Sequence, residues 1–202
     1  MIRNEMERKV ILFIAMSLDG YIANKEDSID FLSMVEQEGE DYGYADFVKT
    51  VDTVILGRKT YEKVIEMGFE YPHTDKDVYI MTRTERPAFG KFKFHTGNIS
   101  RLVHDLKLQP GKNIYCDGGS EIANELMKNN LIDEFIISII PVLLGDGIRL
   151  FKDGIPIQAL KLITSEHFDS GLTQLHYKLE NRNQLKWEKK LYLNHQLLKI
   201  LE

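Results

Sequence analysis

Along the chain, segments with the apolar pattern of buried strands alternate with segments whose apolar residues are spaced as in helices. Residues 9–17 (KVILFIAMS) are apolar without a break from Val10 to Met16, as in a strand covered on both faces. Similar strand-length runs occupy residues 52–57, 77–83, 112–119 and 133–145. Helical spacing is found between them, at residues 40–51, 58–68, 98–108 and 120–130. This repetition of strand and helix predicts a sheet whose strands run mainly parallel.

The ends of the predicted elements support this interpretation. Residues that commonly stop or cap helices stand at the boundaries, namely Gly68, Asn98 or Ser100, and Ser120. Residues 159–180 predict an antiparallel hairpin that turns at Asp169–Gly171. We therefore predict a three-layer α/β/α fold with a mixed, mainly parallel sheet and a C-terminal antiparallel hairpin.

Composition and charge are those of an ordinary globular protein. The 202 residues are 43% hydrophobic and 28% charged, which suits one domain with a sizeable core. A net charge of −5 argues against nucleic-acid binding, and no apolar run is long enough to span a membrane. The single cysteine, Cys116, excludes an intrachain disulfide, and neither it nor the histidines show metal-ligand spacing. With no signal-peptide pattern, we expect a cytoplasmic protein.

Two strand-to-helix junctions carry residues suited to binding an anion. At the first, Gly57 ends a strand, and Arg58, Lys59 and Thr60 follow on the first turn of a helix. Adjacent cations are mildly unfavourable at the positive end of a helix dipole, so their presence favours an anionic ligand. At the second, Gly118-Gly119 would let a pyrophosphate approach the backbone at a helix start. Neither junction matches the P-loop or the dinucleotide fingerprint, and plain turn glycines remain an open alternative.

Five motifs, taken in their order along the chain, resemble one known family. They are IAMSLDGYIA, VILGRKTYE, VYIMTR, IYCDGGSEIANEL and IIPVLLGDGIRLF. Together they resemble the dihydrofolate reductase-like reductases, in the branch that contains the reductase domain of riboflavin biosynthesis. The resemblance runs from about Val10 to Glu180. It implies one reductase domain over residues 1–182, with a C-terminal helical extension of that domain at residues 183–202.

The resemblance implies NADPH as the cofactor and assigns residues to its phosphates. Arg58 would contact the 2′-phosphate, and Lys59 and Thr60 the pyrophosphate, with Gly57 at the turn before them. Thr82 and Arg83 match the segment that closes around the adenine ribose phosphate. Because a charge-assisted hydrogen bond contributes about 1.5–3 kcal/mol, Arg58 and Arg83 together would favour NADPH over NADH by roughly 100-fold or more.

The rest of the implied cofactor site comes from the paired glycines and the first strand. Gly118, Gly119, Ser120 and Glu121 match the loop under the pyrophosphate. Glu121 departs from the family pattern, because folate reductases often carry a cation there. Ala15 and Ile22 match positions that flank the nicotinamide.

The substrate side carries one candidate acid and an apolar wall. Asp30, in SIDFL, matches an acid that precedes an aromatic residue in the riboflavin branch, and it would relay a proton. Glu36 is nearer the folate reductase position, and a structural turn role for Asp30 is the alternative. The resemblance also implies substrate contacts from an apolar set with core packing as its alternative, namely Phe31, Leu32, Pro141, Val142 and Leu144.

These implications define the expected function. We expect an NADPH-dependent oxidoreductase that transfers a hydride to a C=N or C=O bond of a small heterocyclic substrate, either pterin-like or ribosylaminopyrimidine-like. The alternative is a non-catalytic NADP(H)-binding sensor or regulatory module. In the tail, Trp187, Leu191 and Leu198 approximate a helical stripe. Because family relatives are often dimers, we expect this stripe to serve a homodimer contact rather than a membrane.

Overall fold

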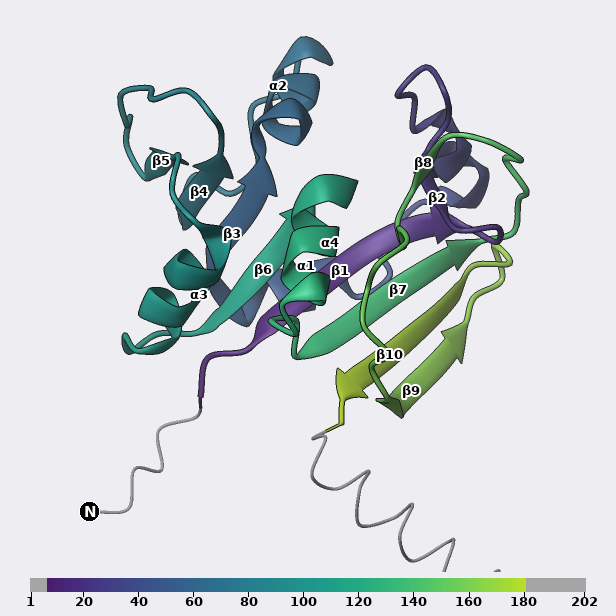
Figure 1. Ribbon diagram of the computed structural model, residues 1–202. Helices are drawn as coiled ribbons and strands as arrows, with labels where there is room; N and C mark the ends of the chain where they lie inside the picture. Colours follow the sequence, from purple (N-terminus) through teal and green to yellow (C-terminus); the bar gives the residue numbers. More distant parts are fainter. Residues whose placement is uncertain (1–6, 181–202) are drawn as a thin grey trace, which may run out of the picture.

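The computed structural model describes residues 7–180, in which strands and helices alternate (Figure 1). The strands are β1 (Val10–Ser17), β2 (Tyr21–Ala23), β3 (Val51–Gly57), β4 (Asp77–Met81), β5 (Phe92–His95), β6 (Asn113–Gly118), β7 (Glu134–Ile140), β8 (Ile148–Arg149), β9 (Leu160–His167) and β10 (Thr173–Leu179). The helices are the 3₁₀-helix η1 (Asp30–Val35) and the α-helices α1 (Tyr44–Lys49), α2 (Arg58–Glu66), α3 (Ile99–Lys107) and α4 (Ser120–Lys128). The predicted extension at 183–202 lies outside the described residues.

One large sheet organises these elements, in the order β5-β4-β3-β6-β1-β7-β10-β9. The six strands from β5 to β7 pair in parallel, while β10 and β9 are antiparallel. The hairpin turn falls between β9 and β10, as the sequence predicts. A second, two-stranded sheet joins β2 to β8. The prediction of a mixed, mainly parallel sheet with a C-terminal hairpin is confirmed.

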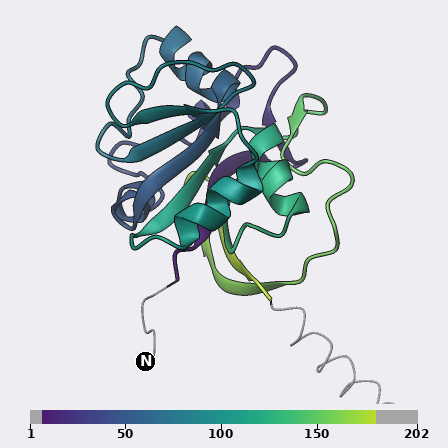
Figure 2. The same ribbon diagram turned by 60° about the vertical axis from the view of Figure 1, so that its left-hand side comes forward.

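Helices cover both faces of the large sheet. Helices α3 and α4 lie side by side on one face (Figure 2). Their apolar side chains join Leu12, Ile55 and Ile114 in one core. Helices α1 and α2 lie on the other face, over a second core rich in aromatic rings that includes Phe47, Tyr115 and Phe92. The two cores explain why the strands β1, β3 and β6 read as continuous apolar runs, and they confirm the three-layer prediction.

Some element boundaries differ from the sequence predictions. Strand β7 ends at Ile140 rather than continuing to residue 145, because Pro141 has no N–H group to donate to a sheet. Helix α1 is shorter than the predicted 40–51, since Gly43 (φ 77°) stands before it and Val51 already pairs with Asn113 in the sheet. The short elements β2, β5, β8 and η1 were not predicted.

Helix caps were predicted with mixed success. Asn98 accepts a hydrogen bond from the Arg101 N–H and caps α3, which settles the choice against Ser100. Gly68 (φ 83°) follows the end of α2, as predicted. The prediction that Ser120 caps α4 was wrong, because Gly119 is the capping residue. Ser120 is buried inside the first turn, and its hydroxyl donates to the Arg149 carbonyl instead.

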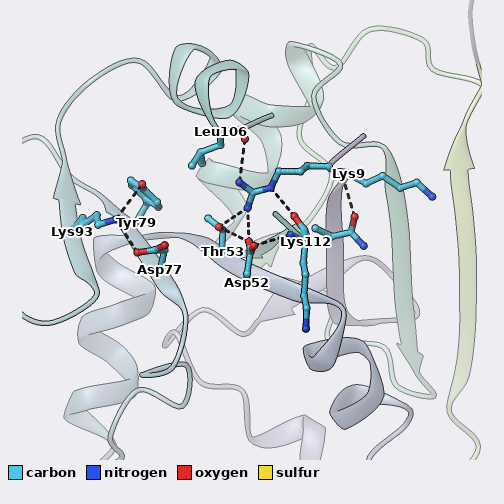
Figure 3. Close-up of polar contacts among 10 residues, drawn as sticks. Lys9, Asp52, Thr53, Asp77, Tyr79, Lys93, Leu106 and Lys112 are labelled. Carbon is cyan, nitrogen blue, oxygen red and sulfur yellow. Dashed lines mark hydrogen bonds and ion pairs between the residues drawn. The ribbon is translucent and has the colours of Figure 1, made fainter. Parts of the chain in front are cut away.

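The amino ends of the central strands are tied together by Arg8, which is 5% exposed. Its guanidinium donates to the Lys112 carbonyl (2.6 Å), the Leu106 carbonyl (3.1 Å) and the Thr53 hydroxyl (2.7 Å). It also forms an ion pair with Asp52, whose other oxygen accepts from the Lys112 N–H (Figure 3). Arg8 precedes β1, Asp52 lies at the start of β3 and Lys112 precedes β6. The network therefore fixes the starts of three adjacent strands.

Replacing Arg8 tests how much the fold depends on this network. Arg8→Met keeps the apolar stem but leaves the buried Leu106 carbonyl and the part-buried Lys112 carbonyl without this donor, and Asp52 without its cation. We expect a loss of about 2–4 kcal/mol in the free energy of unfolding, measured by urea denaturation. The matched control is Lys9→Met, which removes the 53% exposed partner of Glu134 and should cost under about 1 kcal/mol. Equal losses in the two variants would contradict this role for Arg8.

Candidate functional site

The carboxyl ends of β3 and β6 lie against each other at one edge of the sheet. The two strands are neighbours, and Leu56 pairs with Gly118. A Cβ atom added to Gly57 would lie 3.3 Å from Ile122 Cγ1 and 3.9 Å from the Gly118 carbonyl oxygen. Gly118 itself has φ 95°, which favours glycine. The peptide bond between Gly118 and Gly119 is cis. The two predicted junctions thus meet in one place, and the glycines that line it have no side chains to fill it.

A hydrogen bond joins the two junctions directly. The Gly119 N–H donates to Thr60 Oγ1 at 2.8 Å, so the first turn of α2 holds the loop before α4. Both helices begin at this edge, and each contributes unpaired N–H groups and the positive end of its dipole. A Cβ atom added to Gly119 would lie 2.9 Å from the same hydroxyl. The arrangement leaves backbone N–H groups open to an anion.

Cations gather beside this edge, and one of them was missed by the sequence analysis. Arg58 is half-buried and forms an ion pair with Glu62, one turn along α2. Arg86, in the segment after β4, reaches the other oxygen of Glu62 at 3.0 Å and lies over the Phe94 ring. Glu62 therefore holds two arginines beside one another. Only the spatial proximity of α2 and β4 reveals this pair, since the two arginines are far apart in the sequence.

The other residues predicted to contact phosphates differ in how exposed their side chains are. Lys59 and Arg83 are exposed, and Thr82 is half-buried at the end of β4, where its N–H donates to the His95 carbonyl. Glu121 is exposed on the first turn of α4. The Ser120 side chain points into the fold, so only its backbone faces the glycine loop.

The central strand is open beside the glycine loop. Strand β1 is buried from Val10 to Leu12 but only half-buried from Phe13 to Met16, although every one of these residues is apolar. A Cβ atom on Gly118 would lie 3.6 Å from Ile14 Cδ1, which places the open part of β1 at the loop. Ala15 and Ile22, the predicted nicotinamide contacts, are both half-buried in this region. The site thus has a polar edge and an apolar floor.

Most of the predicted substrate contacts come together at the carboxyl end of β1. Phe31, Leu32 and Val142 pack with Ala15 around the buried cluster of Val35, Ile140 and Leu172. Pro141 is exposed, and Leu144 is half-buried, with its N–H donating to Asp19 at 3.1 Å. Asp30 is exposed at the first residue of η1, where its own N–H donates to the Ser28 hydroxyl. The catalytic role of Asp30 stays a prediction.

A second acid, Asp117, lies at the end of β6 among aromatic side chains. Its carboxyl accepts hydrogen bonds from the hydroxyls of Tyr71 and Tyr115, the second at 2.8 Å. Nearby, the Tyr44 hydroxyl lies 3.0 Å from His73 Nε2. Burial raises the pKa of Asp117 above its usual range, although both tyrosines oppose that shift. Burial also lowers the pKa of His73 and raises that of Tyr44 to about 12.

The sequence contained one signal for this cluster. Asp117 is the single charged residue in the apolar run IYCDGG, two positions after Tyr115 and therefore on the same face of the strand. Tyr71 and His73 come from the segment between α2 and β4, and nothing in their spacing indicates that they meet Asp117. Within residues 7–180, no group of His, Cys, Asp or Glu is arranged to hold a metal ion. The same described part of the chain contains no helix of the length and apolar character that crossing a membrane requires.

Comparison with known proteins gives one family. Residues 8–174 match the model described as the RibD C-terminal domain. The chain is 44% identical to YwjB, an uncharacterized protein of Bacillus subtilis, over 85% of this chain and 98% of that protein. A putative riboflavin biosynthesis protein from Shewanella sp. PV-4 has a structure with a TM-score of 0.79 and 30% identity, over 86% of this chain and 99% of that one.

Two more distant structures share the fold at 14% identity. One is a diaminohydroxyphosphoribosylaminopyrimidine deaminase/5-amino-6-(5-phosphoribosylamino)uracil reductase from Thermotoga maritima, with a TM-score of 0.65 over 86% of this chain and 57% of that chain. The other is dihydrofolate reductase from Enterococcus faecalis complexed with NADP(H), with a TM-score of 0.60 over 87% of this chain and 98% of that chain. The dihydrofolate reductase-like fold predicted from the sequence is confirmed.

The hydrogen bond between the two junctions can be tested at Thr60. Thr60→Val keeps the shape of the side chain but leaves the Gly119 N–H without its acceptor, so we expect a loss of about 1–2 kcal/mol in the free energy of unfolding. Thr60→Ser retains the hydroxyl and should recover most of that loss. Urea denaturation of both variants gives the comparison, and equal stability of the valine and serine variants would contradict the proposed link.

The raised pKa of Asp117 predicts a dependence of stability on pH. The folded protein holds this proton to a higher pH than the unfolded chain does, so above about pH 4 the folded state binds more protons. The contribution of Asp117 to the free energy of unfolding should therefore fall as the pH rises from about 4 through the pKa of Asp117 in the folded protein. Asp117→Asn removes the titration, and the stability of the wild type minus that of the variant should decline with pH in urea denaturation. A difference that rises with pH would show that the pKa is lowered instead.

Proposed function

This chain belongs to the RibD C-terminal domain family, and on that premise we propose that it is an NADPH-dependent reductase of a small pyrimidine-type heterocycle. The observation that carries the proposal is the meeting of Gly57 and Gly118-Gly119 at the starts of two helices, beside two arginines. Family membership makes a reductase the first choice of activity. The geometry of the edge then supports a phosphate-bearing cofactor.

The residues at the glycine edge suit the two phosphate groups of NADPH. Backbone N–H groups at the starts of α2 and α4, with no side chain at Gly57, Gly118 or Gly119, suit a pyrophosphate that must approach the backbone closely. Arg58 and Arg86 suit the 2′-phosphate, because a guanidinium can donate two hydrogen bonds to it. Glu62 holds both arginines in place, and a phosphate would compete with it for their N–H groups.

The half-exposed apolar part of β1 suits the nicotinamide ring. It runs from Phe13 to Met16, directly beside the glycine loop. When bound there, NADPH would supply a hydride for a C=N or C=O bond of the substrate. The protein's own contribution would be to orient the two rings and exclude water between them.

The family and its solved relatives favour a pyrimidine over a folate as the substrate. The relative from Thermotoga maritima is named for reduction of a phosphoribosylaminouracil, and the relative from Shewanella is named a putative riboflavin biosynthesis protein. Asp30, the acid predicted from the sequence, is exposed and therefore does not supply the buried carboxylate that a folate site uses. A homodimer and a small-molecule substrate remain part of the proposal.

A cofactor titration at Arg58 tests this function. Purified protein is titrated with NADPH and, separately, with NADH, and cofactor fluorescence is followed. We expect NADPH to bind more tightly, and Arg58→Ala to weaken NADPH by about 1.5–3 kcal/mol, or roughly 10- to 100-fold, while changing NADH little. Arg101→Ala is the matched control, because Arg101 also pairs with an acid one turn along its helix, on α3.

Two outcomes of this titration, and one outcome of an NADPH-oxidation assay with the same protein, are informative. Binding of neither cofactor by the wild type would overturn the proposed function. An equal loss for NADPH and NADH in Arg58→Ala would place the arginine on a group that both cofactors share. Tight NADPH binding without oxidation of NADPH in the presence of any pyrimidine or pterin would favour the sensor alternative.

A further inference from the structure

We propose that the C-terminal extension, residues 183–202, packs as a helix on the apolar face of the β9-β10 hairpin of its own chain. The extension lies outside the described residues. The inference rests on the surface of the hairpin, on the place where β10 ends and on the sequence that follows. It is independent of the proposed function. It assigns the apolar stripe of the extension to a contact within the chain, in place of the homodimer contact expected from the sequence.

Strand β9 leaves an apolar surface uncovered at the edge of the large sheet. It pairs only with β10, and all eight of its residues are exposed. Leu160, Leu162 and Ile163 are each at least 40% exposed, and Ile157, in the segment before β9, is 97% exposed. Figure 1 shows no helix of the described part of the chain over β9. Single exposed apolar residues are ordinary, but four in one short segment indicate a surface that another element covers.

The pairing of the two strands shows which face of the hairpin is apolar. Leu160 pairs with Leu179, and Leu162 pairs with Tyr177. Side chains alternate between the faces of a strand, so these four lie on one face. Tyr177 packs against the core that α3 and α4 cover. The apolar face of the hairpin therefore continues the side of the sheet on which those two helices lie, and it provides room for one more helix.

The outer edge of β9 disfavours pairing with another strand. The register shifts at Ile163, which has no partner on β10, and a bulge of this kind twists an edge strand. Lys161, which pairs with Lys178, also places a cation on the edge strand. A second copy that added its own strand to β9 would meet both features. A helix on the apolar face needs no backbone pairing with β9, so neither feature opposes it.

The extension begins close to this face. Strand β10 ends at Leu179, and the Glu180 N–H donates to the Ala159 carbonyl oxygen at 2.9 Å, directly before β9. The chain therefore leaves the hairpin beside Leu160, and a connection of a few residues can turn it back along the strands. A helix over residues 187–201 would be about 22 Å long, and the eight residues of β9 span about 26 Å. The lengths of the helix and the strand match.

The sequence of the extension complements the hairpin in polarity and charge. Trp187, Leu191, Leu198 and Leu201 recur at helical spacing and form an apolar stripe. The extension carries four lysines and two glutamates, a net charge of +2. The whole chain has a net charge of −5, so residues 1–182 carry −7. Opposite charges attract the two parts, and the short connection gives the extension a high effective concentration at the hairpin.

The fluorescence of Trp187 tests this contact, because Trp187 is the single tryptophan of the chain. In the full-length protein we expect blue-shifted emission and protection from quenching by acrylamide. Leu162→Lys places a charge under the packed helix. We expect it to shift the packing equilibrium toward the free extension by roughly tenfold or more. Its emission should then be red-shifted and its quenching faster.

Thr164→Lys is the matched control, because it adds the same charge to the other face of β9. Thr164 pairs with His176, the neighbour of Tyr177 in β10, and its side chain is exposed. We expect this control to leave the emission and the quenching of Trp187 unchanged. Equal release of Trp187 by the two lysine variants would overturn the assignment to the apolar face. Quenching in the wild type as fast as in free N-acetyltryptophanamide would overturn the proposal altogether.

A variant of the extension itself leaves the hairpin unaltered. Leu191→Lys interrupts the apolar stripe, and we expect it to release Trp187 as Leu162→Lys does. Unchanged protection of Trp187 in this variant would contradict the proposal even if Leu162→Lys fails to fold. Sedimentation velocity should give the same oligomeric state for Leu191→Lys as for the wild type. A wild-type dimer that dissociates in Leu191→Lys would assign the stripe to a second copy and overturn the contact within the chain.

Discussion

One skipped residue in the pairing of β3 with β6 is the constraint on which the site depends. Leu56 pairs with Gly118 rather than with Asp117, so β6 gains a residue against its neighbour. Asp117 lies two residues after Tyr115 and therefore on the same, aromatic face of the sheet, and the extra residue brings Gly118-Gly119 against the end of β3. A strand twists more strongly where such an irregularity occurs. The glycine loop and Asp117 are thus consecutive in sequence, yet the loop lies at the starts of α2 and α4 while Asp117 lies among tyrosines.

The polar groups at the amino ends of the central strands are arranged differently from those at the carboxyl ends. At the amino edge, Arg8 satisfies two carbonyls and an acid and fixes the starts of β1, β3 and β6. At the carboxyl edge, β3 and β6 end in glycines, and β1 has half-buried apolar residues from Phe13 to Met16. Buried polar groups need partners, and the amino edge supplies them within the chain. At the carboxyl edge, helix-start N–H groups lie beside two arginines that are paired with one acid, Glu62.

The layers of the fold and the polar junction at Arg58 could be predicted from the sequence, but the cluster of aromatic side chains around Asp117 could not. Continuous apolar runs identified the central strands, and a glycine next to cations identified the junction at Arg58, because both signals are local. The pairing of Arg86 with Glu62, and the meeting of Tyr71 with Asp117, depend on which segments the fold places side by side. Ser120 is a case in which a local signal misled: serine commonly caps helices, but here its hydroxyl donates to the carbonyl of Arg149, which is distant in the sequence. Asp30, the acid matched through the resemblance in SIDFL, is exposed on a short 3₁₀-helix that the apolar spacing did not predict.

A crystal structure of the protein with NADP⁺ would show where the cofactor binds. We expect the pyrophosphate along Gly118-Gly119, the 2′-phosphate beside Arg58 and Arg86, and the nicotinamide ring beside the half-exposed part of β1. A cofactor bound away from the glycine edge would contradict the proposed site as a whole.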